Sequence, residues 1–238
     1  MMIRATVGIG HFTKKTLIVL ESLERIASKV LKDDDADFQY LKRNIGLELS
    51  IAGDHSNGIR LLDEGYDWLR AHSDNDPLQF RRKMEFAASR LLTHKQFVPA
   101  IRYYKILKDE VIACDDECLT VAARIFESLG DCYFETEDYA SSEENYRLAL
   151  TRIPTDSELN NITGTLKGKL ASCLFKQKTR HTEIEQLLLQ AHKILHDTKT
   201  PDLLRVSTVE EQLVDLYETL GKIDMVEKWR SNKGKADI

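Results

Sequence analysis

Apolar residues near the N-terminus recur at spacings of three and four positions, the period of one face of an α-helix. They are Leu17, Leu20, Leu23, Ile26, Ala27, Val30 and Leu31. We therefore predict a helix over about residues 13–32.

A second pattern recurs along the chain at a fixed period of 42 residues. One column of this repeat is mostly small and contains Gly46, Ala88, Gly130, Ser172 and Val214. The column three positions later is apolar throughout and contains Leu49, Leu91, Tyr133, Phe175 and Tyr217. Two helices approach closely where one residue is small, and a bulky residue fills the space beside it. The columns predict paired helices, with Cys132 packed in or beside such a contact.

The repeat divides the chain into helix pairs without a long linker between them. We expect pairs at about 37–72, 78–114, 119–154, 158–197 and 203–233, forming one domain over 1–238. Asp stands in every join between pairs, where its side chain would cap the following helix. A step of 42 residues back from Gly58 and Leu62 reaches Thr16 and Leu20. The N-terminal helix thus corresponds to the second half of a preceding unit.

The third unit preserves the pattern best. Its residues Phe126, Leu129, Gly130, Tyr133, Ser142, Tyr146, Ala149 and Pro154 resemble the tetratricopeptide repeat, with Phe126 in place of Trp and Ser142 in place of Ala. The 42-residue period is similar to that of the kinesin light chain repeats and is shared by many other families. The resemblance implies an all-α fold, a right-handed α-solenoid of about five antiparallel helix pairs preceded by a half-repeat helix.

Composition narrows the function classes. The chain has 42% hydrophobic and 31% charged residues, and its 4 prolines and 11 glycines suit long helices. A net charge of -5 gives no global basic field, which disfavours nucleic acid as the main ligand. The aliphatic stretch Leu17–Leu20 is too short for membrane insertion or an export signal. Four irregularly spaced cysteines predict reduced thiols in the cytoplasm, with the nucleus as the alternative.

Candidate chemical motifs are weak. The acidic run Asp33–Asp37 lacks the glycine and glutamate of a calcium loop. His192 and His196 have a spacing that can hold a metal, but the sequence supplies no further ligand. Cys114 and Cys118 flank two acids, which raise a thiol pKa and disfavour reactivity. No phosphate loop or nucleophile elbow is present, so we expect no enzyme activity, cofactor or metal.

The resemblance implies that the first helix of each pair lines a concave groove. Carried onto this chain, the groove positions are Tyr40, Arg43, Arg82, Ser89, Arg124, Asp131, Phe134, Lys169 and Lys176, with Glu85, Glu127, Glu211 and Asp215 beside them. In the fourth unit, Leu166, Leu170 and Leu174 suggest a helix that is rotated or shifted by one residue.

Arginines at matching depth in successive units favour an acidic segment as ligand. The alternative is that Arg82 and Arg124 pair along their own helices with Glu85 and Glu127. The lysine and asparagine of chaperone-binding clamps are replaced by Arg43 and Leu47, so a chaperone tail is not expected.

These observations support a non-catalytic scaffold or adaptor that binds a peptide segment, or a subunit of a multiprotein complex, through the groove. The alternative is a regulatory sensor, in which a peptide or small ligand changes the curvature of the solenoid. The sequence does not identify the partner.

Overall fold

The computed structural model describes residues 3–72, 77–112, 119–153, 160–197 and 202–233, and within these ranges the chain is helical with no strand. Its helices are α1 (Ile3–Val30), α2 (Ala36–Ile51), α3 (His55–Ala71), α4 (Pro77–Thr93), α5 (Phe97–Ile112), α6 (Leu119–Glu135), α7 (Tyr139–Thr151), α8 (Asn160–Lys176), α9 (His181–His196), α10 (Leu203–Thr219) and α11 (Ile223–Lys233). The predicted all-α fold is confirmed.

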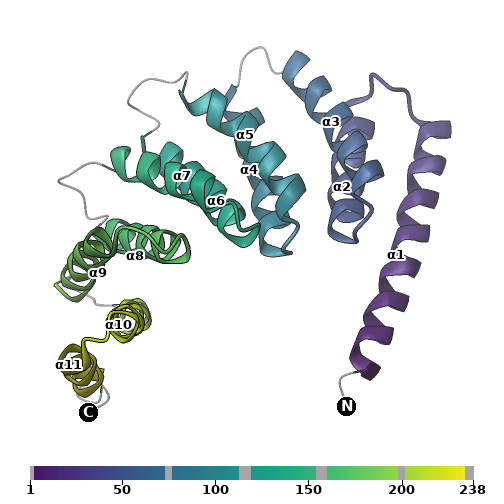
Figure 1. Cartoon of the computed structure of the whole chain (residues 1–238). Coiled ribbons are helices and arrows are strands. Elements are labelled where there is room, and N and C mark those ends of the chain that lie inside the picture. The colour runs from purple at the N-terminus through teal and green to yellow at the C-terminus, as the bar shows by residue number, and fades with distance from the viewer. Residues whose placement is uncertain (1–2, 73–76, 113–118, 154–159, 198–201, 234–238) are drawn as a thin grey trace. The chain divides into compact units, whose positions relative to one another are not determined.

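Helices that follow one another in the sequence pack in pairs (Figure 1). The most extensive contacts join α2 to α3, α6 to α7 and α8 to α9, and smaller ones join α10 to α11. The chain forms two compact units, residues 1–110 and 111–238. The first unit holds α1 to α4 and most of α5, and the second holds the end of α5 and α6 to α11. The packing of consecutive helices in pairs confirms the predicted α-solenoid.

Helix α1 is longer than the apolar pattern indicated. It begins at Ile3, about ten residues before the predicted start, and the glycines Gly8 and Gly10 lie inside it. Glycine is among the poorest helix formers, so this stretch carries no helical signal of its own. Leu17 and Leu20 pack against a core cluster of Ile45, Leu49 and Leu61.

Small residues make the close helix contacts that the repeat predicted. A Cβ atom on Gly130 would lie 2.6 Å from the ring of Tyr146, so the ring occupies the space that the glycine leaves. A Cβ on Gly46 would lie 2.7 Å from the carbonyl oxygen of Gly58. Cys132 is fully buried beside the first contact, and burial raises the pKa of its thiol to about 12. The thiol therefore stays protonated and serves packing.

The turns inside the pairs repeat at 42 residues as well. Gly53, Lys95, Glu137 and Gly221 stand in matching places with φ of 98°, 59°, 63° and 68°. Asp54 and Asp138 follow in the next position and cap α3 and α7 through the backbone N–H groups of Asn57 and Ser141. The fourth pair departs from this rule, because the left-handed residues are Lys178 and Arg180 and no side chain caps α9.

Among the joins between pairs, only the cap at Asp202 falls on described residues, where its carboxylate accepts a hydrogen bond from the backbone N–H of Arg205. The predicted caps elsewhere lie outside those residues. Asp35 caps α2, which gives the acidic run Asp33–Asp37 a structural role at a helix start.

Candidate functional site

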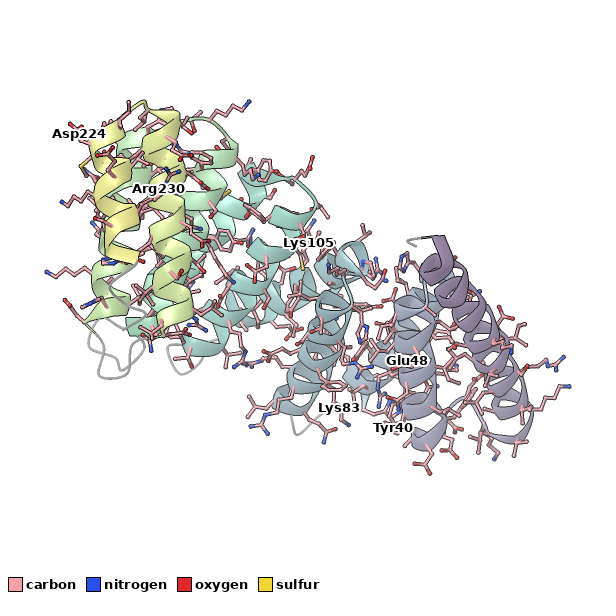
Figure 2. The ribbon with its side chains drawn as sticks, turned by 90° about the horizontal axis from the view of Figure 1, so that it is seen from below. Tyr40, Glu48, Lys83, Lys105, Asp224 and Arg230 are labelled. Atoms are coloured by element: carbon pink, nitrogen blue, oxygen red, sulfur yellow. The ribbon has the colours of Figure 1, made fainter. Side chains whose placement is uncertain are left out.

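The first unit contains a recess between α2 and α4, the first helices of two successive pairs. It has a volume of about 280 Å³ and is lined by Tyr40, Arg43, Asn44, Leu47, Tyr66, Arg82, Lys83, Phe86 and Ala87. We call it the first recess. Figure 2 labels Tyr40 on α2 and Lys83 on α4, which mark its two sides. Three of the predicted groove residues, Tyr40, Arg43 and Arg82, lie together here.

Arg43 forms the fixed part of the first recess. Its Nη1 donates a hydrogen bond to the backbone oxygen of Gly65 at 3.0 Å, and its guanidinium lies 5.9 Å from the ring centres of both Tyr40 and Tyr66. Burial lowers the pKa of Arg43, yet a guanidinium remains protonated at neutral pH. The wall of the recess therefore carries a permanent positive charge in a partly dehydrated place.

The rim of the first recess is exposed, aromatic and cationic. Tyr40 and Phe86 are 59% and 61% exposed, which is unusual for large aromatic side chains. Arg82 is exposed and has no ion pair with another described residue, whereas Lys83 donates to the side chain of Gln79. The lining contains no carboxylate. Such a surface attracts a group that combines negative charge with apolar surface.

The second unit contains a second recess, with a volume of about 180 Å³. It is lined by Phe134 of α6, by Ala171, Ser172, Phe175 and Lys176 of α8, by Ile184 and Leu188 of α9, and by Gln212 and Asp215 of α10. The predicted groove residues Phe134 and Lys176 meet here, and so does Asp215. Its lining holds one cation and one anion, so it is mainly an apolar recess with a polar rim.

The three leucines of α8 that the sequence singled out are buried. Leu166, Leu170 and Leu174 are at most 1% exposed. Leu174 occupies the interior, and Phe175, which belongs to the apolar column of the repeat, turns into the recess. The side-chain oxygen Oε1 of Gln212 is buried and has no hydrogen-bond partner among the described residues, while its Nε2 donates to Ser172. In the second recess, Oε1 of Gln212 is therefore a hydrogen-bond acceptor without a donor among the described residues.

Two predicted groove residues of the second unit are bonded to each other. The Nζ atom of Lys169 lies 2.7 Å from Glu127 and 2.8 Å from Asp131, and Asp131 also accepts a hydrogen bond from Tyr146. Burial opposes the charge on Lys169, but the two carboxylates outweigh it and raise the pKa of the lysine. These ions join α6 to α8 and are not available to a ligand in this arrangement.

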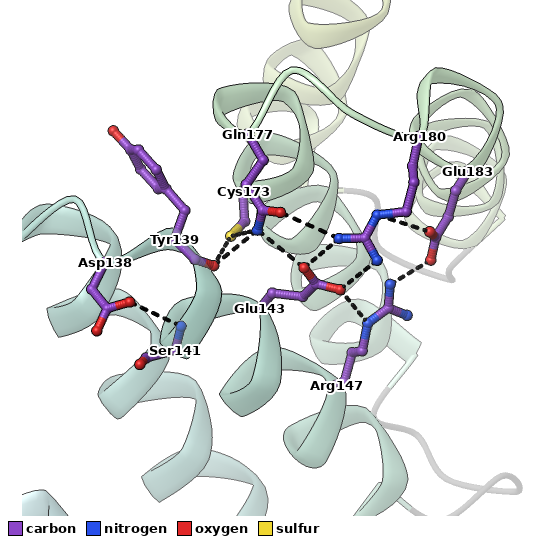
Figure 3. A network of polar contacts seen from close by, with 9 residues as sticks. All are labelled: Asp138, Tyr139, Ser141, Glu143, Arg147, Cys173, Gln177, Arg180 and Glu183. Atoms are coloured by element: carbon purple, nitrogen blue, oxygen red, sulfur yellow. Dashed lines mark hydrogen bonds and ion pairs between the residues drawn. The ribbon is translucent and has the colours of Figure 1, made fainter.

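A second ion network joins α7 to the start of α9 (Figure 3). Glu143 accepts hydrogen bonds from Arg180, from Arg147 at 2.9 Å and from Gln177 at 3.0 Å. Burial alone would raise the pKa of Glu143, but these donors lower it to about 2. The left-handed Arg180, which gives α9 no side-chain cap, instead contributes its guanidinium to this network.

The remaining candidates lie apart from both recesses. Ser89 and Arg124 are exposed on α4 and α6 and line neither. The Nε2 atom of His192 lies 3.0 Å from Glu210, and its ring packs against Trp229. Within the described residues no group of three or more side chains could hold a metal ion. Cys114 and Cys118 lie outside those residues.

The sequence analysis did not predict the ion pairs between successive helix pairs, although the 42-residue spacing of the charged residues indicates them. Glu127 and Lys169 are 42 residues apart, as are Glu48 and Arg90, whose side chains lie 3.0 Å apart. In these two columns, opposite charges 42 residues apart form an ion pair between neighbouring helices. Reading Glu127 only as a partner of Arg124 overlooked this.

Comparisons with known proteins bear on the fold alone. No protein-family model matches the chain, and no curated protein matches it. The crystal structure of BtubC (BKLC) from P. vanneervenii is similar, with a TM-score of 0.63 and 14% sequence identity, over 95% of this chain and 90% of that one. In the part of the chain that the structure describes, no helix is long and apolar enough to cross a membrane. At this level of identity, the likeness supports a helical-repeat architecture.

Proposed function

We propose that this chain is a non-catalytic adaptor that binds a peptide segment of a partner protein in the first recess. The segment carries an acidic side chain beside an apolar one. The observation that carries the proposal is the lining itself, in which Arg43, Arg82 and Lys83 surround one cavity together with Tyr40 and Phe86 and without a carboxylate.

Residues of α2 and α4 would make different contributions to binding. Arg43 is held by Gly65 and by the tyrosine rings, so it presents its charge without losing much side-chain entropy on binding. Arg82 lies opposite on the rim and can form a bidentate pair with a carboxylate. Tyr40 and Phe86 lose exposed aromatic surface when an apolar side chain lies between them, and aromatic and arginine side chains are typical binding hot spots.

A fluorescent peptide with Asp and Glu around a central Leu or Phe tests the proposal. We expect wild-type protein to bind it and Arg82→Glu to weaken binding about tenfold or more, as expected for loss of a charge-assisted pair. Phe86→Ser should weaken binding of peptides with either central residue. A peptide with Lys in place of the acids should not bind.

Arg124→Glu is the matched control, because Arg124 stands 42 residues after Arg82 on an equivalent helix but lines neither recess. Equal weakening by both reversals would mean that net charge, not the first recess, governs binding, and the proposal would fail. Capture from a native extract with mass spectrometry then identifies the partner. A ligand-dependent change in solution scattering without a captured partner would instead favour a sensor.

A further inference from the structure

The outer face of α1 carries an exposed apolar stripe that the first recess does not use. Val19, Leu23, Ile26 and Val30 are 64%, 41%, 58% and 75% exposed, and they follow one another at intervals of four, three and four residues. This is the spacing of a helix–helix seam. The opposite face of α1 packs on the first unit through Leu17 and Leu20.

The repeat shows what such a face does elsewhere in the chain. Val19 and Leu23 stand 42 residues before Leu61 and Gly65 of α3. Leu61 is fully buried, and a Cβ on Gly65 would lie 2.5 Å from Cγ of Arg43 on α2. In α3, therefore, these positions pack against the first helix of their own pair. In α1 the same positions are open.

The equivalence also indicates how near an occupant can approach. At the contact positions, α3 has Gly58 and Gly65, where α1 has Thr16 and Leu23. The backbone of a helix on α1 must then stay farther away than α2 stays from α3, at a separation set by interdigitating side chains, within the usual range of about 8–10 Å. The site suits a helix with its own apolar stripe, not a glycine-mediated contact.

The basic residues near the stripe indicate which kind of partner suits it. Lys15 and Lys29 border the stripe, with Arg25 behind them, and all three are exposed without an ion pair to another described residue. A second copy in antiparallel register would bring these lysines toward each other, which is unfavourable. Ile18, which is 55% exposed, widens this apolar face, so an anionic membrane would also suit it, and membrane binding is one outcome of the test below. We favour a partner helix with acidic residues, because it matches both the lysines and the four, three and four residue spacing of the stripe.

We propose that the outer face of α1 docks an amphipathic helix of a partner protein, with acidic residues flanking its apolar stripe. This helix occupies the place that the first helix of a pair takes on α3. The surface differs from the first recess, and the proposal does not depend on the proposed function.

The probe is a synthetic helical peptide of about three heptads with Leu and Ile at the seam positions and Glu at the flanking ones. Its counterpart carries Lys instead of Glu. Fluorescence anisotropy should show that the full chain binds the Glu peptide at least about tenfold more tightly than the Lys peptide. Lys15→Glu combined with Lys29→Glu should reverse this preference.

Val19→Glu combined with Ile26→Glu should abolish binding of the Glu peptide, whereas Leu204→Glu, at a 78% exposed apolar position on α10, should leave it unchanged. Circular dichroism checks that the variants remain helical, and the uncharged pair Val19→Ser and Ile26→Ser replaces the Glu pair if it does not. Equal binding by the α1 variants overturns the proposal. So does binding to phosphatidylserine vesicles in place of the peptide, or a wild-type dimer that the α1 variants dissociate.

Discussion

The first helices of the pairs use their charged residues differently in the two units. In the first recess, the cations Arg43, Arg82 and Lys83 line a cavity without a carboxylate. In the second unit, the corresponding groove cation Lys169 is bonded to Glu127 and Asp131. The same inner positions therefore line a recess in one unit and form ion pairs between helices in the other. The comparison shows that the repeat predicts where a groove residue lies. Whether that residue forms an ion pair depends on the residues that the neighbouring helix pair places beside it.

The largest expected effect concerns packing in the second unit. Gly130→Leu should lower the free energy of unfolding by about 3 kcal/mol or more, because the side chain would collide with Tyr146. Chemical denaturation measures this. Gly168→Ala is the control, since its Cβ would meet Val209 at an ordinary 3.4 Å, and this change should be neutral or stabilising. An unchanged midpoint for Gly130→Leu would refute the packing of α6 on α7.

The Glu143 network should make the second unit sensitive to acid. Its pKa is lowered from 4.5 to about 2 in the folded chain, so its contribution is complete above about pH 4.5 and is lost as the pH falls toward 2. We expect a loss on the order of 2 kcal/mol over this window. Glu143→Gln should remove that part of the pH dependence while lowering stability at pH 7. Parallel pH profiles for the variant and wild type would show that the network contributes nothing.

A matched pair of neutral substitutions tests the comparison directly. Lys169→Met leaves two carboxylates without their cation and should cost about 1–2 kcal/mol, between the values for exposed and buried ion pairs. Arg82→Met should change stability by less than about 0.5 kcal/mol, because its charge has no such partner. Thermal unfolding of both variants checks this. If both substitutions cost the same, the division between recognition and cohesion is wrong.

A small gain in stability should be found in both units. Lys95 and Glu137 adopt left-handed backbone conformations at equivalent turn positions where Gly53 and Gly221 stand in other pairs. Lys95→Gly and Glu137→Gly should each stabilise the chain by about 0.5–1 kcal/mol, since glycine adopts this conformation without strain. Denaturant midpoints measure the gain. A loss of stability at either site would mean that its side chain makes a contact worth more than the strain.

Much of this architecture could be predicted from the sequence, because helix pairing depends on local spacing. The 42-residue columns predicted the close contact at Gly130, where the ring of Tyr146 fills the space beside the glycine. The start of α1 could not be predicted in this way, since Gly8 and Gly10 weaken the local helical signal. The charge partners were missed because they depend on two helices meeting in space. Lys169 and Glu127 share a column, but only their packing distance makes that a bond.

The contact between Gly46 and Gly58 determines which second substitutions can compensate for a mutation at either glycine. A Cβ on either residue would collide with backbone atoms of the other helix, 2.7 Å away at the nearest. The opposing residue is already glycine, so no smaller side chain exists that could restore the space. Gly130 differs, because Tyr146 opposite it can be shortened. A genetic selection should therefore recover second-site suppressors of Gly130→Ala at Tyr146, whereas suppressors of Gly46→Ala should arise only as global stabilisers elsewhere in the chain.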